Sequence, residues 1–162
     1  MTFQNNILVD VNGEAVLCDF GFSRIRYEVT RTQTNIREGG RLRYLAPELS
    51  YGPDSFRTTA ASDVYSLAMT LFNLSTLRMP YEEHRNEMAA ADAARNGQRP
   101  QKPNTTRFFA GSFNTLWELL VLMWKHDDSA RPTAATVAQH LKGNLHRFIH
   151  ASTQNDMTSP SA

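Results

Sequence analysis

The first residues in this sequence that could do chemistry are an aspartate and an asparagine beside two short apolar runs. Asp19 follows the run Ala15–Cys18 and lies two residues before Gly21, and a carboxylate at a strand end before a flexible glycine is well placed to bind a cation. Asn6 opens the other run, Ile7–Val9, so both oxygen-bearing side chains could face one ion if the runs pair as adjacent strands. Each feature also has a commoner explanation, because turns and caps favour the same residue types.

A glutamate and an arginine far apart in the chain form a second candidate pair. Glu48 follows Ala46 and Pro47, and Arg131 directly precedes Pro132. Each could be an exposed residue, the arginine at the start of a helix. If the two instead pair in the interior, removing one partner would cost about 3–5 kcal/mol. Their role would then be structural rather than catalytic.

The metal-binding candidates must be positioned by a hairpin. Residues Asn6 to Phe20 contain two short apolar runs with Asn12-Gly13 between them, and this dipeptide is the strongest short signal for a hairpin turn. Residues 21–55 show no sustained period, and a loop that long in a compact domain is usually functional or mobile.

Four helices are predicted in the rest of the chain. Apolar residues recur at three- and four-residue steps over Ala60–Leu77, and Ser62 and Asp63 near its start suit a helix N-terminus. Three further helices are predicted: Glu83–Asn96, Phe113–Trp124 and one that Pro132 opens. We expect one domain over residues 1–150 and a polar, disordered tail over residues 151–162.

Composition excludes several classes of function. The 162 residues are 41% hydrophobic and 20% charged, enough to bury a core, and 17 basic against 16 acidic residues argue against a protein that coats nucleic acid or a membrane surface. A single cysteine, Cys18, excludes an internal disulfide and a cysteine-rich zinc site. No signal peptide or membrane segment is visible, so a soluble cytoplasmic protein is expected.

Several short motifs, each weak alone, are together typical of one family. They are N-I-L-V-D at 6–10, D-F-G at 19–21, G-R-L-R-Y-L-A-P-E at 40–48, S-D-V-Y-S-L at 62–67, G-Q-R-P at 97–100 and W-K-H-D-D-S-A-R-P-T at 124–133. With these motifs, the sequence resembles a eukaryotic protein kinase of the serine/threonine type, near the tyrosine-kinase-like branch. The resemblance covers nearly all of residues 5–142. It implies a mainly α fold, namely the C-terminal lobe of a kinase with a β-hairpin and four or more helices, without the N-terminal lobe.

The resemblance also implies a role for each candidate residue. Asp19 and Asn6 match the residues that hold Mg²⁺ on the phosphates of ATP. Glu48 and Arg131 match the family's buried ion pair, and Asp63 matches the aspartate that holds the backbone of the catalytic loop. The strip that receives the peptide substrate matches Gly40, Arg41, Leu42, Arg43, Tyr44 and Leu45. The activation segment matches Phe22 to Tyr44, with possible phosphorylation sites at Thr30, Thr32 and Thr34, although an ordinary polar loop explains these threonines better.

The sequence departs from the family where catalysis would occur. Aligned on Asn6, the catalytic aspartate falls on Met1 and the phosphate-contacting lysine on Phe3. No G-x-G-x-x-G motif is present, and no lysine precedes Lys102, so both phosphate-gripping lysines are missing from this chain. Arg41 stands where the serine/threonine type usually has a threonine. The tripeptide His84-Arg85-Asn86 resembles the H-R-D motif only superficially, because it comes after the helix at 60–77.

Two functions remain as hypotheses. In the first, the chain is a fragment of a domain that phosphorylates protein serine or threonine with ATP and Mg²⁺, and we expect it to be inactive and without bound nucleotide when alone. Alternatively, it is a non-catalytic, pseudokinase-like interaction module, while an unrelated helical binding domain is a remote third reading. The expected partner is a protein substrate or a regulatory protein, with no nucleic acid and no membrane segment.

Overall fold

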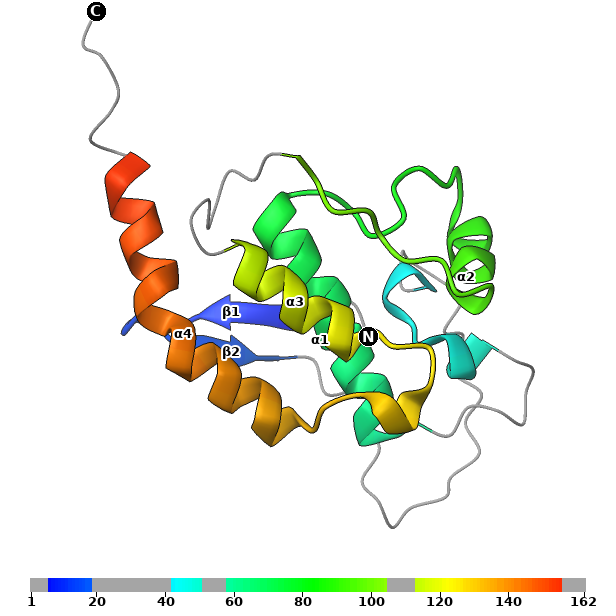
Figure 1. Cartoon of the computed structure of the whole chain (residues 1–162), viewed down its shortest axis with the longest axis horizontal. Helices are drawn as coiled ribbons and strands as arrows, with labels where there is room; N and C mark the ends of the chain where they lie inside the picture. Colours follow the sequence, from blue (N-terminus) through cyan, green and yellow to red (C-terminus); the bar gives the residue numbers. More distant parts are fainter. Residues whose placement is uncertain (1–5, 19–41, 51–57, 105–112, 156–162) are drawn as a thin grey trace, which may run out of the picture.

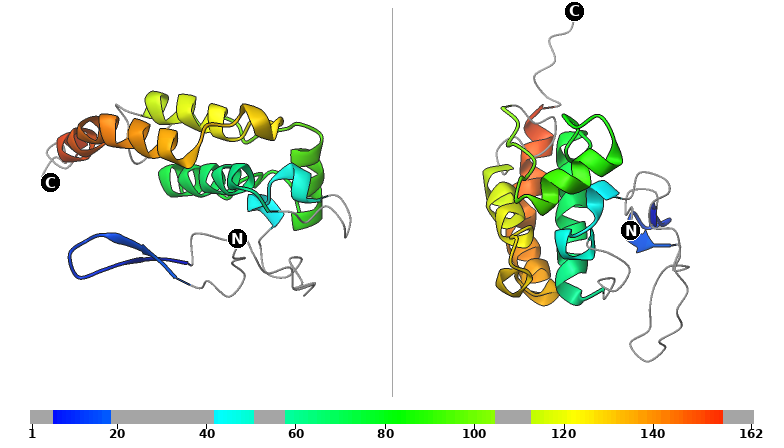
Figure 2. Two further views of the ribbon diagram at one scale, coloured as in Figure 1. Left: turned by 90° about the horizontal axis from the view of Figure 1, so that it is seen from below. Right: turned by 90° about the vertical axis from the view of Figure 1, so that its right-hand side faces the viewer.

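The chain forms a helical body and a short β-hairpin (Figure 1), and the hairpin lies on one side of the helices (Figure 2). The computed structural model describes residues 6–18, 42–50, 58–104 and 113–155. The elements in chain order are β1 (Ile7–Val9), β2 (Ala15–Leu17), α1 (Ala60–Thr76), α2 (Glu87–Arg95), α3 (Phe113–Met123) and α4 (Ala134–Asn155). Short 3₁₀ turns lie at Leu42–Tyr44, Pro47–Ser50 and Asp128–Ala130. The predicted mainly α fold with one hairpin and four helices is therefore confirmed.

The hairpin pairs its two strands antiparallel, with Leu8 opposite Val16. Gly13 has a φ of 82°, whereas Asn12 does not adopt a positive φ. The connection is a three-residue turn in which Gly13 alone takes the left-handed conformation, rather than a two-residue turn. The Asp10 carboxylate accepts the backbone amides of Glu14 and Asn12, both at 2.8 Å, and these bonds lower the pKa of Asp10.

Helix α1 is the central element of the helical body. It begins with a capping box in which the Thr59 hydroxyl accepts the Ser62 amide at 3.1 Å and the Ser62 hydroxyl accepts the Thr59 amide at 2.9 Å. Residues on most of its faces are buried, as predicted, including Tyr65, Met69 and Phe72. The helix ends at Leu77, which adopts a left-handed conformation with a φ of 57°.

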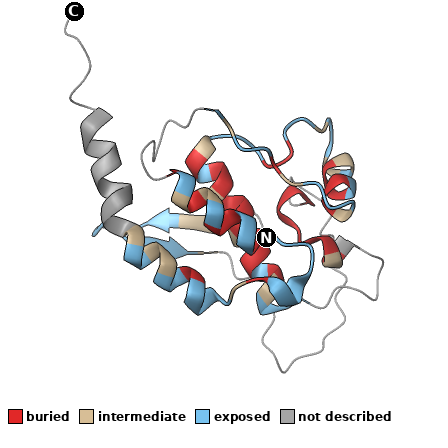
Figure 3. Ribbon diagram, in the orientation of Figure 1, coloured by how far each residue is buried: buried red, intermediate tan, exposed pale blue. Residues whose placement is uncertain are grey.

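Helices α1 and α3 pack against each other, and buried residues run along both of them (Figure 3). The ring of Phe72 lies 6.5 Å from Trp117 and 6.2 Å from Trp124, and the two tryptophan rings meet nearly edge-on at 5.3 Å. Helix α2 packs at one end of the body against the two turns within residues 42–50. These turns carry the predicted substrate strip and Glu48.

Three helix boundaries differ from the predicted ones by two residues or more, and one is the start of α4, which lies at Ala134 rather than at Pro132. Helix α2 begins at Glu87 rather than Glu83, because the Asn86 side chain accepts the Ala89 amide at 2.9 Å and caps the helix there. Helix α4 continues to Asn155, five residues into the segment predicted as a disordered tail. None of the helices in the described ranges is long and apolar enough to cross a membrane.

The hairpin exposes apolar side chains on both of its faces. Leu8, Val9, Val16 and Leu17 are 56%, 72%, 45% and 51% exposed. Figure 2 shows the hairpin as a layer below α1, with α3 and α4 on the opposite side of that helix. The helical body and the hairpin therefore differ sharply in how much apolar surface they bury.

Candidate functional site

Glu48 and Arg131 form an ion pair joined by two hydrogen bonds. The Arg131 Nη1 lies 2.7 Å from Glu48 Oε1, and its Nη2 lies 2.8 Å from Oε2. The arginine side chain is fully buried, whereas the glutamate side chain is 30% exposed. A planar guanidinium facing a carboxylate in this way is the strongest form of such a pair. The structure thus brings together two residues that are 83 positions apart in the chain.

The remaining donors of Arg131 bind backbone carbonyls. Its Nε donates to Lys125 at 2.8 Å, Nη1 donates to Ala61 at 3.0 Å, and Nη2 donates to His126 at 3.3 Å. The guanidinium therefore ties the segment after α3 to the first turn of α1 and to the turn that carries Glu48. With its donors engaged inside the fold, Arg131 is placed to hold elements together rather than to bind a ligand.

A buried tyrosine on α1 lies beside this pair. The Arg131 guanidinium carbon is 5.1 Å from the centre of the Tyr65 ring, and that of Arg99 is 5.3 Å away. The Tyr65 hydroxyl lies 2.9 Å from the Tyr81 hydroxyl, which donates to the Gln98 carbonyl. Burial raises the pKa of Tyr65 well above its ordinary value, so the phenol stays protonated.

Arg99, in the G-Q-R-P motif, links the ends of two helices. Its Nε donates to the Trp124 carbonyl just after α3, and its Nη1 donates to Ala94 in the last turn of α2 at 3.0 Å. Positive charge is favourable at helix C-termini, where carbonyls lack partners. The motif was recognised in the sequence, but no spacing rule predicted that Arg99 and Arg131 would contact the same tyrosine.

The described part of the predicted substrate strip is buried. Leu42, Arg43, Tyr44 and Leu45 are all 8% exposed or less, and the Tyr44 carbonyl accepts the Ser66 hydroxyl of α1 at 2.8 Å. The side chain of Arg43 turns into the molecule and binds Glu87 of α2 at 2.7 Å. The predicted strip residues Gly40 and Arg41 lie outside the described residues, as do the predicted phosphorylation sites Thr30, Thr32 and Thr34.

Only one of the two predicted metal ligands lies in the described part of the chain. Asn6 directly precedes β1, and its carbonyl accepts the amide of Cys18, the residue before Asp19, at 2.8 Å. Asp19 itself lies outside the described residues. The amide and carboxylate oxygens of Asn6 and Asp19 are donors of the kind that Mg²⁺ prefers. Within the described ranges, no three His, Cys, Asp or Glu side chains cluster as a metal site would require.

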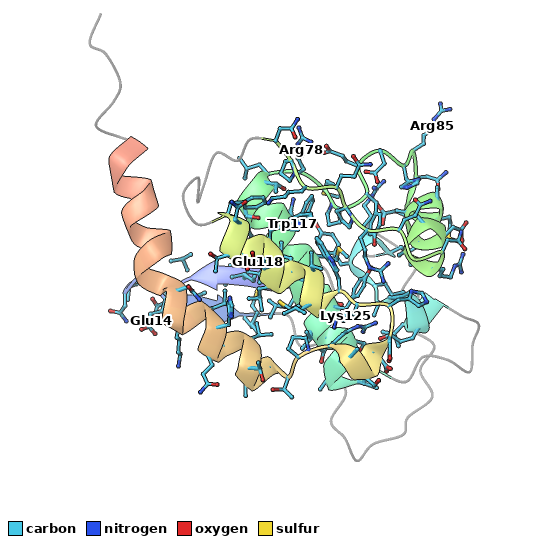
Figure 4. The ribbon with its side chains drawn as sticks, in the orientation of Figure 1. Glu14, Arg78, Arg85, Trp117, Glu118 and Lys125 are labelled. Atoms are coloured by element: carbon cyan, nitrogen blue, oxygen red, sulfur yellow. The ribbon has the colours of Figure 1, made fainter. Side chains whose placement is uncertain are left out.

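The other predicted residues lie on the outside of the helical body. Asp63 is exposed in the first turn of α1, and the segment it was predicted to hold, residues 1–5, is outside the described residues. Arg85 is exposed and extends away from the body (Figure 4). Sequence reasoning missed Tyr65 and Glu87 as organising residues, because a buried polar contact depends on which elements meet.

Comparison with known proteins identifies one family. The model of the protein kinase domain matches residues 4–141. The chain is 30% identical over 138 residues to the serine/threonine-protein kinase STY46 of Arabidopsis thaliana, covering 85% of this chain and 22% of that protein.

Two Dictyostelium discoideum proteins are equally similar. A probable serine/threonine-protein kinase is 30% identical over 156 residues, covering 93% of this chain and 16% of the relative. A probable inactive serine/threonine-protein kinase is 30% identical over 158 residues, covering 96% of this chain and 7% of the relative. The chain thus spans less than a quarter of each of these relatives.

Proposed function

This chain belongs to the protein kinase family, and on that premise we propose that it is the C-terminal part of a domain that phosphorylates protein serine or threonine with ATP. The observation that carries the proposal is the family match over residues 4–141, within which Glu48 and Arg131 make the ion pair that the resemblance implies. The serine/threonine specificity is supported by the names of the similar proteins. The cofactors of the intact domain would be ATP and Mg²⁺.

Asn6 and Asp19 are the residues proposed to hold Mg²⁺ on the ATP phosphates. When bound, the metal would neutralise phosphate charge during transfer. The hairpin supports this proposal because it pairs Asn6 with Cys18, the neighbour of Asp19. The strip Gly40–Leu45 is proposed to position the protein substrate, and Asp63, Glu48 and Arg131 are proposed to hold the surrounding backbone.

Phosphoryl transfer by this chain alone is not expected. Such transfer depends almost entirely on positioned charge, and residues 1–18 contain no Lys, Arg or His. Loss of the general base alone is worth about 10²–10⁴ in rate. The chain would therefore supply metal ligands and a substrate strip to a larger domain without performing the reaction by itself.

A thermal-shift experiment tests whether this chain alone binds the nucleotide. The chain is melted with MgCl₂ alone and with Mg·ATP, and we expect equal melting temperatures, because a ligand that does not bind the native state cannot stabilise it. A rise of several degrees with Mg·ATP would show that the chain holds the nucleotide on its own and would overturn the proposed inactivity.

The activity itself is tested by extending the chain. The coding region upstream of Met1 is read in frame for H-x-D-x-K and a glycine-rich motif, and the extended protein is assayed for transfer of labelled phosphate to a general protein substrate. Asp19→Asn in the extended protein is the matched control, because it removes a proposed metal ligand with little change in shape. Activity that is abolished in the control supports the proposal, whereas an inactive extended protein favours the alternative.

The alternative is a non-catalytic interaction module. It is supported by the similarity to a protein named as a probable inactive kinase and by the apolar side chains that the hairpin exposes. An upstream region with a stop codon and no kinase motifs would favour this alternative.

A further inference from the structure

Arg43 lies in the predicted substrate strip, but its side chain faces the interior and not a substrate. Its side chain is 9% exposed, and all three guanidinium nitrogens have partners. The Nε donates to Glu87 Oε1 at 2.7 Å, Nη1 donates to the Pro80 carbonyl at 3.1 Å and to the Tyr81 carbonyl, and Nη2 donates to the His84 carbonyl at 2.9 Å. Arg43 therefore has little capacity left to recognise a peptide directly.

Glu87 holds Arg43 from two sides. While Oε1 accepts the guanidinium, Oε2 accepts the backbone amide of Arg43 at 3.3 Å. Both oxygens of one carboxylate thus bind one residue of the 3₁₀ turn Leu42–Tyr44. Glu87 is also the first residue of α2, where the helix dipole favours a negative charge. The turn and the helix N-terminus are consequently joined by a charge-assisted contact.

The carbonyls that Arg43 binds belong to a loop with an unusual backbone. Tyr81 has a φ of 57°, although it is not glycine, and the residue is buried. A bulky residue in this region costs free energy and persists only where its surroundings hold it. The Arg43 guanidinium binds the carbonyls of Pro80 and Tyr81, which flank the Tyr81 Cα, and that of His84. These three bonds stabilise this conformation of the loop.

We propose that Arg43 and Glu87 are positioning residues that make the strip Leu42–Leu45, the loop Pro80–His84 and the start of α2 a single structural unit. A partner or substrate that binds one of these segments would thereby alter the others. The description of residues 42–45 as a substrate strip depends on the proposed function, but the coupling between the segments depends only on the contacts above.

Hydrogen exchange of backbone amides in the Glu87→Gln variant tests the coupling. Glutamine has one side-chain oxygen where the carboxylate uses two, so either the Arg43 amide or its Nε loses its acceptor. We expect exchange about tenfold faster in both residues 42–45 and residues 80–87, because the lost hydrogen bond to a charged group no longer holds the two segments closed. Faster exchange of the Leu42, Tyr44 and Leu45 amides is the diagnostic result, because the direct bond of Glu87 in this strip is to the Arg43 amide.

The matched control is Glu82→Gln. Glu82 belongs to the same loop region, is exposed and pairs with Arg78 at 3.5 Å instead of with Arg43. We expect exchange in residues 42–45 to be unchanged by this variant. Arg43→Lys keeps the positive charge but cannot present a planar fork to four acceptors, so it should accelerate exchange in the same two segments.

Three outcomes would overturn the proposal. One is acceleration by Glu87→Gln that is confined to α2, with residues 42–45 unchanged. Another is a uniform increase that includes α3, which would show only a general loss of stability. A third is wild-type exchange in Arg43→Lys. Because no nucleotide is present in these experiments, failure of the kinase assay and failure of the coupling are separate results.

Discussion

At the scale of single residues, the number of acceptors around each buried arginine explains why it can be buried. Five oxygen atoms surround the guanidinium of Arg131: both carboxylate oxygens of Glu48 and the carbonyls of Ala61, Lys125 and His126. A buried charge without such partners would be strongly unfavourable. The glutamate supplies the compensating charge, and the carbonyls use the remaining donors.

Replacing Glu48 by alanine should therefore lower stability strongly. The change leaves the fully buried Arg131 charge without its carboxylate, and we expect a loss of about 3–5 kcal/mol in the free energy of unfolding. Urea denaturation of the chain measures this loss. Glu82→Ala is the control, because its pair with Arg78 is exposed on both sides and such pairs contribute about 0–1 kcal/mol. Equal losses in the free energy of unfolding for the two substitutions would show that the buried pair contributes no more to stability than the exposed one.

The sequence led to part of this site and not to all of it. Glu48 and Arg131 were paired on the basis of family motifs, and the structure places them in contact. The contacts of Arg131 with carbonyls, and of Arg43 with Glu87, could not be predicted in the same way. Backbone carbonyls carry no sequence signature, and Glu87 is an ordinary helix-start glutamate until the fold brings it to Arg43.

At the scale of the elements, the residue that caps the end of α1 has a strained backbone conformation. Leu77 caps the helix in a left-handed conformation, and its amide donates to the Asn73 carbonyl at 2.8 Å. Glycine is usual at such positions, because a side chain there collides with the following carbonyl. Leu77 is 59% exposed, so little packing compensates for the strain. The left-handed conformation of Leu77 ends the helix, although a leucine side chain does not favour that conformation.

Leu77→Gly should accordingly stabilise the protein. Removing the strain is worth about 1–2 kcal/mol, and the added flexibility of the unfolded chain offsets part of it, so we expect a net gain of roughly 0.5–1 kcal/mol. Thermal denaturation measures the difference. Leu74→Gly is the matched control: Leu74 is 45% exposed within the same helix, and glycine there should destabilise by about 1 kcal/mol. Destabilisation by both variants would contradict the account of the cap.

Helices with clear apolar periods were predicted well, and their ends were predicted less well. The bounds of α1 and α3 agree with prediction to within one residue, because Leu, Met and Phe recur on their buried faces. Helix α2 was predicted to begin four residues early, since Glu83–Arg85 are polar residues compatible with a helix. Their turn conformation follows from tertiary contacts of the neighbouring carbonyls with Arg43, which no local pattern reveals.

At the scale of the whole molecule, stability should be unevenly distributed. The helical body has a continuous buried core, whereas the side chains of β1 and β2 are largely exposed on both faces. A two-stranded hairpin without a covering layer is marginal in water. Among the described elements, β1 and β2 are therefore the ones that burial stabilises least.

Hydrogen exchange should resolve these two levels of stability. We expect the amides of β1 and β2 to exchange near the rate of an unstructured peptide, while those in the middle of α1 exchange only on global unfolding. Peptide-level exchange followed by mass spectrometry makes the comparison within one sample. Hairpin amides that exchange together with those of α1 would show that the two parts unfold as one unit.

The positions of the two tryptophans determine what optical measurements on this chain can detect. Trp117 and Trp124 are the only tryptophans in the sequence, and their rings lie 5.3 Å apart against Phe72 in the core between α1 and α3. Both rings lie in that core, so emission excited selectively at tryptophan reports on the core and not on the tyrosines elsewhere in the chain. A melting curve followed by tryptophan emission would record the helical body and not the hairpin, even if the pairing of Asn6 with Cys18 were lost.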